Sequence, residues 1–197
     1  MGAATTGDAV AVNSGARFYV PTENEWYKAA YYDPTLNSGA GGYRAYGNGF
    51  DAAPGTVSAD AVGNGSVGGA GNFANYNTAA DWNGQNGNVT TVGTNGGANY
   101  FAAYDMSGNI FEWNDLTGVA GPFRELRGGN WLNPSASFLS SSSRNPDEPP
   151  ELEAGWVGFR LASRIPVPEI DPSNIGSVLA FVLGALGLLE RRRLKAA

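Results

Sequence analysis

The sequence predicts an α+β domain with much irregular loop, followed by a C-terminal transmembrane helix. A capped amphipathic pattern at 22–32 predicts a helix, an alternating pattern at 156–162 predicts a strand, and Arg127–Trp131 suggests a strand that enters a glycine pair. Glycine is abundant, with 29 residues, and much of it lies between 39 and 97 beside Asn, Ala and Ser. Gly and Asn tolerate the positive φ angles that turns demand, so this middle segment is predicted to be loop.

Charge divides the chain into an acidic body and a basic end. Residues 1–163 carry 7 basic and 15 acidic side chains, a net of −8, whereas residues 164–197 carry 5 basic and 3 acidic, a net of +2. Binding to a phosphate backbone needs clustered Lys and Arg. The acidic body therefore argues against nucleic acid as a partner.

The chain contains no cysteine and no histidine. This composition excludes a disulfide framework, a thiolate nucleophile and Cys-ligated metal sites. It also removes the usual proton shuttle and the commonest transition-metal ligand. Hard, oxygen-ligated cations such as Ca²⁺ remain the natural metal candidates.

The predicted helix begins at a capping box. The Thr22 side chain is placed to accept a hydrogen bond from the third helical amide, while Glu25 reaches back to the cap. The residues that follow put Trp26 and Ala30 on one face, and Asp33-Pro34 stops the helix. We expect a scaffold helix packed on a sheet.

The stretch from Asn37 to about Ala102 has little periodicity. Asn88–Val92 alternates well enough for a short strand, but most of the stretch must be loop. A structureless stretch of this length in a compact domain is usually functional or pinned by something. Bound cations are one way to pin it.

One segment has the composition of a calcium loop. Asp105 and Glu112 are carboxylates seven residues apart around Gly108. Calcium takes about six to eight oxygen ligands from carboxylates and backbone carbonyls in flexible geometry. Both side chains, together with the carbonyls of Gly108 and Ile110, would supply four of them. On spacing alone, a solvated turn is the alternative.

The later strands frame a serine-rich segment. Arg127–Trp131 suggests a strand that enters a glycine pair with Trp131 turned inward, and 156–162 suggests a closing strand. Arg160 in the closing strand either pairs with a buried acid or faces outward. Residues 135–144 contain six serines and no base, so a serine nucleophile is not expected.

Four segments, taken in order, resemble the formylglycine-generating-enzyme (sulfatase-modifying factor) family. They are residues 17–26, 104–113, 126–131 and 158–161. The resemblance covers roughly residues 16–163, and the N-terminal part of the family domain has no counterpart here. It implies a variant of the C-type-lectin fold, with small sheets, two helices and abundant loop.

The resemblance also implies two calcium sites. The residues that match the first site are Asp105, Gly108, Ile110 and Glu112. The residues that match the second site are Asn75, Tyr76, Asn86 and Asn88. In the second site, Asn86 stands in place of an acidic ligand.

The match fails at the catalytic centre of the family. Family enzymes hold copper with two cysteines, and the matching positions here are Asn133 and Phe138. Neither residue binds Cu(I), which needs soft ligands. The iron-dependent branch of the family needs histidines, which this chain lacks. Copper and catalytic residues are therefore not expected.

The C-terminus carries a membrane-spanning pattern. Residues 173–189 are 17 residues without a charge, which as a helix would extend roughly 25 Å. This length lies at the short end of what spans a bilayer, and a buried C-terminal helix is the alternative. The basic cluster that follows favours the cytoplasmic side, which puts the body outside the cytoplasm.

Residues 166–195 resemble a PEP-CTERM sorting signal, which bacterial exosortases read. The residues that carry this resemblance are Pro168, Glu169, Arg191, Arg192 and Arg193. It implies that the membrane anchor is cut near the Pro-Glu motif and that the protein is delivered to the bacterial cell surface or extracellular matrix.

These observations give a domain organisation in five parts. They are an N-terminal segment without a defined pattern (1–15), a partial sulfatase-modifying-factor-like domain (16–163), a linker with the Pro-Glu motif (164–172), the transmembrane helix (173–189) and a basic cytoplasmic tail (190–197). We expect a surface-displayed, non-catalytic module that calcium stabilises and that binds glycan or protein. The alternative is an oxidoreductase of the family that acts on protein cysteine, with catalytic residues supplied by a missing N-terminal part or a partner.

Overall fold

The computed structural model describes residues 15–114 and 123–163. The chain divides into a compact unit over 1–162 and a second unit over 163–197, of which Ser163 alone is described. The predicted linker, transmembrane helix, basic tail and sorting residues lie outside the described residues, as does almost all of the segment 1–15. Within the described ranges, no helix has the length and apolar character that crossing a bilayer requires.

Helix α1 (Glu23–Tyr31) begins at the predicted capping box. The Thr22 hydroxyl accepts from the Glu25 amide at 3.3 Å, and the Glu25 carboxylate accepts from the Thr22 amide at 3.0 Å. Trp26, Ala30 and Tyr31 are buried, so the predicted inward face is confirmed. The helix ends at Tyr31, just before the Asp33-Pro34 stop.

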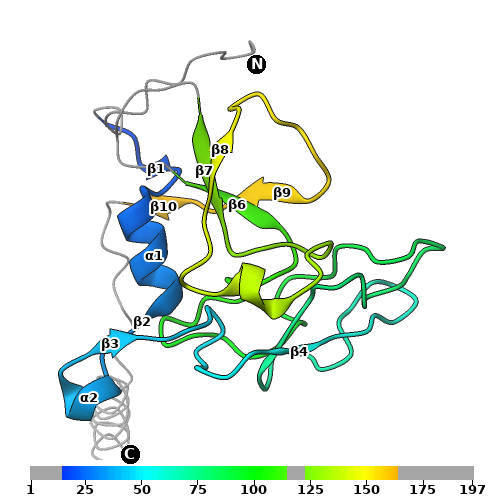
Figure 1. The fold of residues 1–197 in the computed structure, drawn as a ribbon, viewed down its shortest axis with the longest axis horizontal. Coiled ribbons are helices and arrows are strands. Elements are labelled where there is room, and N and C mark those ends of the chain that lie inside the picture. The colour runs from blue at the N-terminus through cyan, green and yellow to red at the C-terminus, as the bar shows by residue number, and fades with distance from the viewer. Residues whose placement is uncertain (1–14, 115–122, 164–197) are drawn as a thin grey trace, which may run out of the picture. The chain divides into compact units, whose positions relative to one another are not determined.

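A four-stranded sheet lies beside α1 (Figure 1). Its strand order is β8 (Asn145–Glu148), β7 (Arg124–Arg127), β6 (Phe111–Asn114) and β9 (Val157–Phe159). Strand β6 pairs antiparallel with β7 and parallel with β9, and β7 pairs antiparallel with β8. This register places Glu112 between Arg127 on one side and Gly158 on the other.

The predicted closing strand over 156–162 forms as two shorter pieces. Strand β9 covers its first part, and β10 (Ala162–Ser163) begins at the last residue of the first unit and pairs with β1 (Phe18–Tyr19). Two further sheets are also two-stranded. Antiparallel β2 (Tyr32–Asp33) and β3 (Gly42–Tyr43) form one, and parallel β4 (Gly55–Thr56) and β5 (Phe73–Ala74) form the other.

The remaining helical pieces are single turns. They are α2 (Leu36–Gly39), in which Asn37 and Ser38 have positive φ angles of 52° and 59°, and the 3₁₀ turn η1 (Ala136–Leu139). Apart from β4 and β5, residues 44–102 run as the loop that composition predicts, drawn from cyan to green in Figure 1. The strand predicted at Asn88–Val92 is wrong. The Thr90 amide and carbonyl bond instead to the Asn109 side chain, at 2.9 and 3.1 Å.

The core lies between α1 and the segment that enters β6. Trp26, Ala30, Tyr31 and Met106 form its buried cluster, with Trp26 and Tyr31 in edge contact at 5.8 Å between ring centroids. Gly128 lies beneath Trp26, and a side chain there would meet the indole at 3.4 Å. The described residues therefore form a mixed α and β domain with small helices and sheets, as predicted.

Candidate functional site

Glu112 is a buried carboxylate at the centre of the sheet. The Trp26 indole N–H donates to its Oε2 at 2.7 Å, and the Arg160 Nε lies 2.7 Å from both oxygens. Arg160 also donates to the Tyr104 carbonyl. Burial raises the pKa of the Glu112 carboxyl, and the Arg160 guanidinium opposes that shift. Of the two alternatives for Arg160, the pairing with a buried acid is confirmed.

Asp105 binds the middle loop through its carboxylate. Its Oδ2 accepts from the Gly93 amide at 2.8 Å and its Oδ1 accepts from the Asn95 side chain at 3.1 Å. Asp105 itself has a positive φ of 54°, which an Asp tolerates better than most residues do. The two carboxylates of the first predicted calcium set thus serve different partners.

The structure brings together part of the second predicted set. Asn75 is fully buried, and its Nδ2 donates to the Asn88 carbonyl at 2.8 Å, but its Oδ1 has no hydrogen-bond partner among the described residues. The Tyr76 hydroxyl instead donates to the Pro54 carbonyl at 2.8 Å. The Asn86 side chain is exposed and makes no hydrogen bond with a described residue.

The two sets differ in how well they suit an oxygen-seeking cation. Arg160 already neutralises Glu112 and occupies both of its oxygens, and Asp105 is satisfied by backbone and amide donors. The first set therefore fits a cation poorly in this arrangement. In the second set, the buried Asn75 Oδ1 is an oxygen without a donor, which is the chemistry that calcium seeks. Within the described ranges, no three acidic side chains cluster as a metal site.

A buried asparagine network pins the middle loop. Asn109 Oδ1 accepts from the Thr90 amide, the Thr90 hydroxyl and the Asn75 side chain, at 2.9, 3.1 and 3.1 Å. The Thr90 hydroxyl donates to Asn95 Oδ1 at 2.6 Å, which links the network to Asp105. Sequence reasoning expected the loop to be pinned and named cations as one means. It named Asn75 and Asp105 as calcium ligands but did not identify Asn95 or Asn109, because Asn is equally common in exposed turns.

Asn133 and Phe138, which the resemblance places at the family's copper ligands, lie in different surroundings. Asn133 Oδ1 accepts from the Asn130 amide at 2.7 Å and closes the turn after the glycine pair. Phe138 lies on η1 and is 43% exposed. An amide and a phenyl ring supply no soft ligand for Cu(I). The residues at this centre therefore do not fit copper.

A second buried ionic cluster anchors the serine-rich segment. Glu125 is fully buried, and Arg144 binds both of its oxygens, at 2.6 and 3.1 Å. The neighbouring Arg127 pairs with Glu23 at 2.5 Å and donates to the carbonyls of Ser141 and Ser143, at 3.1 and 2.9 Å. The cluster ties α1, β7 and the serine segment together. Sequence reasoning missed it because Glu23 lies 104 residues from Arg127 and Glu125 lies 19 residues from Arg144.

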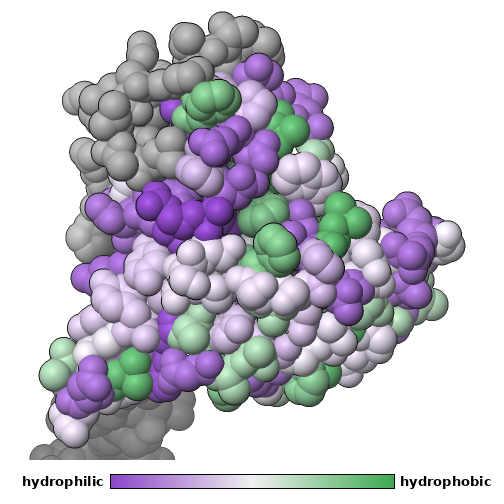
Figure 2. Space-filling view, in the orientation of Figure 1, coloured by the Kyte–Doolittle hydropathy of each residue, from purple (hydrophilic) through white to green (hydrophobic). Residues whose placement is uncertain are grey.

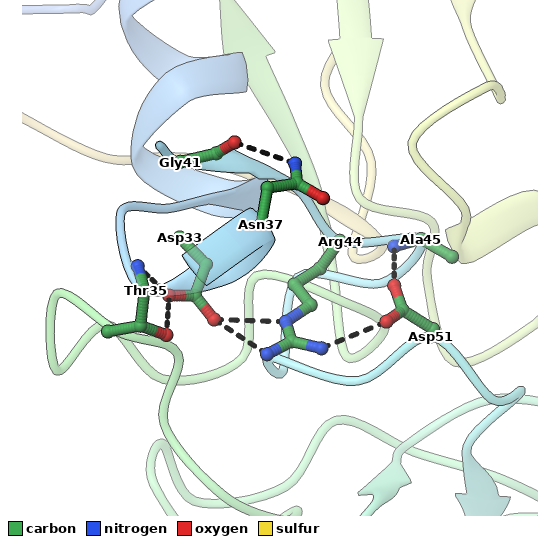
Figure 3. Close-up of polar contacts among 7 residues, drawn as sticks. All are labelled: Asp33, Thr35, Asn37, Gly41, Arg44, Ala45 and Asp51. Carbon is green, nitrogen blue, oxygen red and sulfur yellow. Dashed lines mark hydrogen bonds and ion pairs between the residues drawn. The ribbon is translucent and has the colours of Figure 1, made fainter. Parts of the chain in front are cut away.

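A third ionic cluster holds the β2–β3 hairpin against the following loop. Figure 3 shows Arg44 between two carboxylates, bonding Asp33 at 2.8 Å and Asp51 at 2.9 Å. Asp33 also accepts from the Thr35 amide and hydroxyl, at 2.9 and 2.6 Å. These Thr35 hydrogen bonds, together with Arg44, lower the pKa of Asp33. Both carboxylates and the guanidinium in this cluster have hydrogen-bond partners. We therefore assign the cluster a structural role and call it the staple around Arg44.

The fold and the sites define a class of protein. It is a small mixed α/β scaffold with long loops fixed by buried polar side chains. Residues 3–165 match the sulfatase-modifying factor enzyme 1-like domain, and the chain belongs to this family. A search of curated proteins finds no match.

Three solved structures illustrate what the chain is similar to. Treponema denticola variable protein 1 is 23% identical with a TM-score of 0.47, over 78% of this chain and 50% of that one. CarF is 24% identical with a TM-score of 0.47, over 75% and 47%. PvdO from Pseudomonas aeruginosa is 23% identical with a TM-score of 0.45, over 77% and 54%. The chain thus spans about half the length of these proteins.

Proposed function

We propose that this chain is a non-catalytic binding module of the sulfatase-modifying-factor family, with a lectin-like fold, displayed at the bacterial surface. One observation carries the proposal: the chain has no cysteine and no histidine. The family's reaction needs copper-binding cysteines or iron-binding histidines, and Asn133 and Phe138 stand where the cysteines would. The family scaffold is present without the side chains of its chemistry.

An aromatic loop supports a role in binding. Tyr100 and Phe101 are 54% and 48% exposed, and their rings meet edge to face at 5.3 Å. Asn99 fixes the loop by donating to the carbonyls of Ala29 and Ala30, at 2.7 and 3.1 Å, at the end of α1. Rigid exposed aromatic rings lose little entropy on stacking against a sugar or peptide.

The indoles of Trp82, Trp131 and Trp156 are less suitable for stacking. Trp82 donates its N–H to the Val89 carbonyl at 2.7 Å and packs over Gly63, and Trp156 meets Phe111 at 6.1 Å. The indole nitrogen of Trp131 is buried. On the face drawn in Figure 2, hydrophobic residues are scattered among polar ones rather than joined in one apolar patch. These features favour a small polar ligand with an apolar face, such as a glycan.

A binding screen tests this proposal. The full chain would be applied to an array of bacterial polysaccharides, beside a Tyr100→Ala/Phe101→Ala variant. We expect binding of at least one glycan by the chain and its loss in the variant. Phe159→Ala, which removes an equally exposed ring from β9, is the matched control and should keep binding. Equal loss in both variants, or no glycan bound, would count against the proposal.

Calcium enters the proposal as a structural ion. The unpartnered, fully buried Asn75 Oδ1 supports an oxygen-ligand site, whereas the Asp105–Glu112 set competes with Arg160. We expect Ca²⁺ to raise the thermal unfolding midpoint of the chain relative to chelator. The calcium-dependent part of that shift should vanish in Asn75→Ala and persist in Asp105→Asn. A midpoint that ignores calcium in the unsubstituted chain would remove calcium from the proposal.

Surface display rests on the C-terminal pattern, through insertion in the membrane and recognition by an exosortase. Cell fractionation tests it with Pro168→Ala/Glu169→Ala, which removes the motif, and with the three arginines 191–193 changed to Ala as a second variant. We expect the unsubstituted chain to be processed and released to the surface, and both variants to stay unprocessed in the membrane fraction. Release of the variants would exclude sorting by this signal.

The family assignment itself favours a second function. A member that spans half the length of its solved relatives would work as a formylglycine-generating oxidoreductase if another part or partner supplied the missing ligands. Calorimetry with Cu⁺ and turnover of a cysteine peptide separate the two functions. Tight Cu⁺ binding or formylglycine formation by the chain would overturn the binding module in favour of the oxidoreductase.

A further inference from the structure

The chain contains five Asn-Gly pairs, at 48, 64, 83, 86 and 95, all within the described residues. Asn-Gly is the sequence in which a backbone amide most readily attacks the preceding side chain, since glycine has no Cβ to obstruct the approach. Reaction needs two conditions. The Asn side chain must be free to turn onto the next nitrogen, and that nitrogen must be able to release its proton.

Three of the five side chains are held in place. Asn48 Nδ2 donates to Asn72 at 2.8 Å, Asn64 Nδ2 donates to Asp60 at 3.0 Å, and Asn95 Nδ2 donates to Asp105 at 3.1 Å. Asn48 and Asn95 are also buried. A side chain held by such bonds must break them before it reacts, which slows the reaction by the cost of local opening. Asn83 and Asn86 are exposed and make no such bond with described residues.

Gly87 meets the second condition. Its amide N–H donates to the Asp81 Oδ1 at 2.6 Å, so a carboxylate lies on the proton that must leave. A base must lie within hydrogen-bond reach of the proton that it takes. The backbone of Gly87 is further fixed by a φ of 78° and by Thr78, which a side chain at Gly87 would meet at 2.7 Å. Among the residues that the structure describes, no carboxylate accepts a hydrogen bond from the amide of Gly84, the residue after Asn83.

We propose that Asn86 is a self-modification site, at which the chain converts this asparagine into aspartate and isoaspartate. The Gly87 nitrogen forms a bond to Asn86 Cγ, and the bond from Cγ to Nδ2 breaks. The Gly87 proton passes by way of Asp81 to the leaving nitrogen, which departs as ammonia. Water then opens the resulting succinimide at either carbonyl. The product carries one more negative charge in a loop that already holds Asp81.

Peptide mass spectrometry of the folded full chain, aged at neutral to mildly alkaline pH, tests the proposal. We expect the mass gain of amide-to-acid conversion to appear at Asn86 several-fold faster than at Asn83, and faster still than at Asn48, Asn64 and Asn95. Asp81→Asn should slow Asn86 several-fold and leave Asn83 unchanged. In the denatured chain, the five sites should react at similar rates.

Controls separate the chemistry from unfolding. Thermal melting confirms that Asp81→Asn is folded, and Asn86→Gln should abolish the modified peptide without affecting the other four. A rate at Asn86 no greater than that at Asn83, or a rate that Asp81→Asn leaves unchanged or increases, would overturn the proposal. In the last case the bond to Asp81 would be protecting Gly87 rather than activating it.

Discussion

At the scale of single residues, Glu112 is a buried carboxylate that links segments far apart in the sequence. It receives hydrogen bonds from α1 through Trp26 and from the residue after β9 through Arg160. Burying a carboxylate is unfavourable unless its charge is matched and its oxygens are bonded, and both conditions are met here. Glu112 on β6 therefore links α1 to the segment after β9 through its buried carboxylate.

Replacing Glu112 by Gln tests this role. The amide keeps the shape but loses the charge, which leaves Arg160 without its partner. We expect the free energy of unfolding to fall by about 3 kcal/mol, as for broken buried pairs. Trp26→Phe removes one donor and some packing and should cost about 2 kcal/mol. Urea denaturation of both variants measures the changes, and a loss near zero for Glu112→Gln would contradict the role.

Asp33 contributes to the dependence of stability on pH. Hydrogen bonds from Thr35, and then from Arg44, hold the pKa of Asp33 below its ordinary value. A carboxyl with a lowered pKa in the folded state contributes stability above its unfolded pKa of about 4, and this contribution is lost as pH falls through the folded value. We expect Asp33→Asn to lower the melting midpoint at pH 7 and to flatten its decline in acid.

The control for Asp33 is Asp147, which is exposed and makes no ion pair with described residues. Asp147→Asn should leave the melting midpoint and its acid decline close to those of the unsubstituted chain. If Asp33→Asn and Asp147→Asn behave alike from pH 3 to 7, the staple around Arg44 does not govern acid stability.

At the scale of elements, the long loop over 44–102 contains buried side chains that hydrogen-bond to one another. Its backbone turns back repeatedly, and buried Asn and Thr side chains replace the hydrogen bonds that a sheet would have supplied. Close backbone approaches follow, since Gly96 lies where a side chain would meet the Phe73 carbonyl at 2.3 Å. A loop of this kind behaves as one packed unit.

Two glycine substitutions measure how rigid the loop is. Gly39 and Gly96 both have positive φ, 92° and 124°, but only Gly96 has a neighbour within van der Waals contact. We expect Gly39→Ala to cost about 1 kcal/mol for backbone strain alone. Gly96→Ala should cost about 3 kcal/mol or more, because β5 must also move. Equal melting midpoints for the two variants would mean that the loop yields easily.

The sequence was sufficient where structure depends on neighbours along the chain. The capping box at Thr22 and Glu25, the stop at Asp33-Pro34 and the turn at Gly128 and Gly129 all follow from local rules. The Asn75–Asn109 bond and the Arg144–Glu125 pair join residues 34 and 19 positions apart, and no period links them. Asp105 and Glu112 could be chosen from their spacing in the sequence. Their hydrogen-bond partners lie in other segments of the chain, so spacing could not identify them.

At the scale of the whole molecule, β9 pairs with β6 and extends the sheet. Arg160 completes the set of hydrogen bonds that Trp26 of α1 makes with Glu112 of β6. A chain that ends at residue 153 lacks both, so β6 loses its parallel neighbour and Glu112 loses its counter-charge. We expect such a chain to melt without a cooperative transition. A chain that ends at 165, where the family match ends, should melt cooperatively. Circular dichroism of the two truncations measures this, and equal cooperativity would contradict it.

The bond from Trp26 to Glu112 spans 86 residues, and the pair of Arg127 with Glu23 spans 104. Folds dominated by such distant contacts form slowly, because loop closure comes before any stabilising contact. During synthesis, α1 leaves the ribosome long before Glu112 and Arg127 have been made. Its apolar face is therefore exposed to solvent during this time. We therefore expect the nascent chain to be most vulnerable to proteases in the interval before residues 112 and 127 have been synthesised.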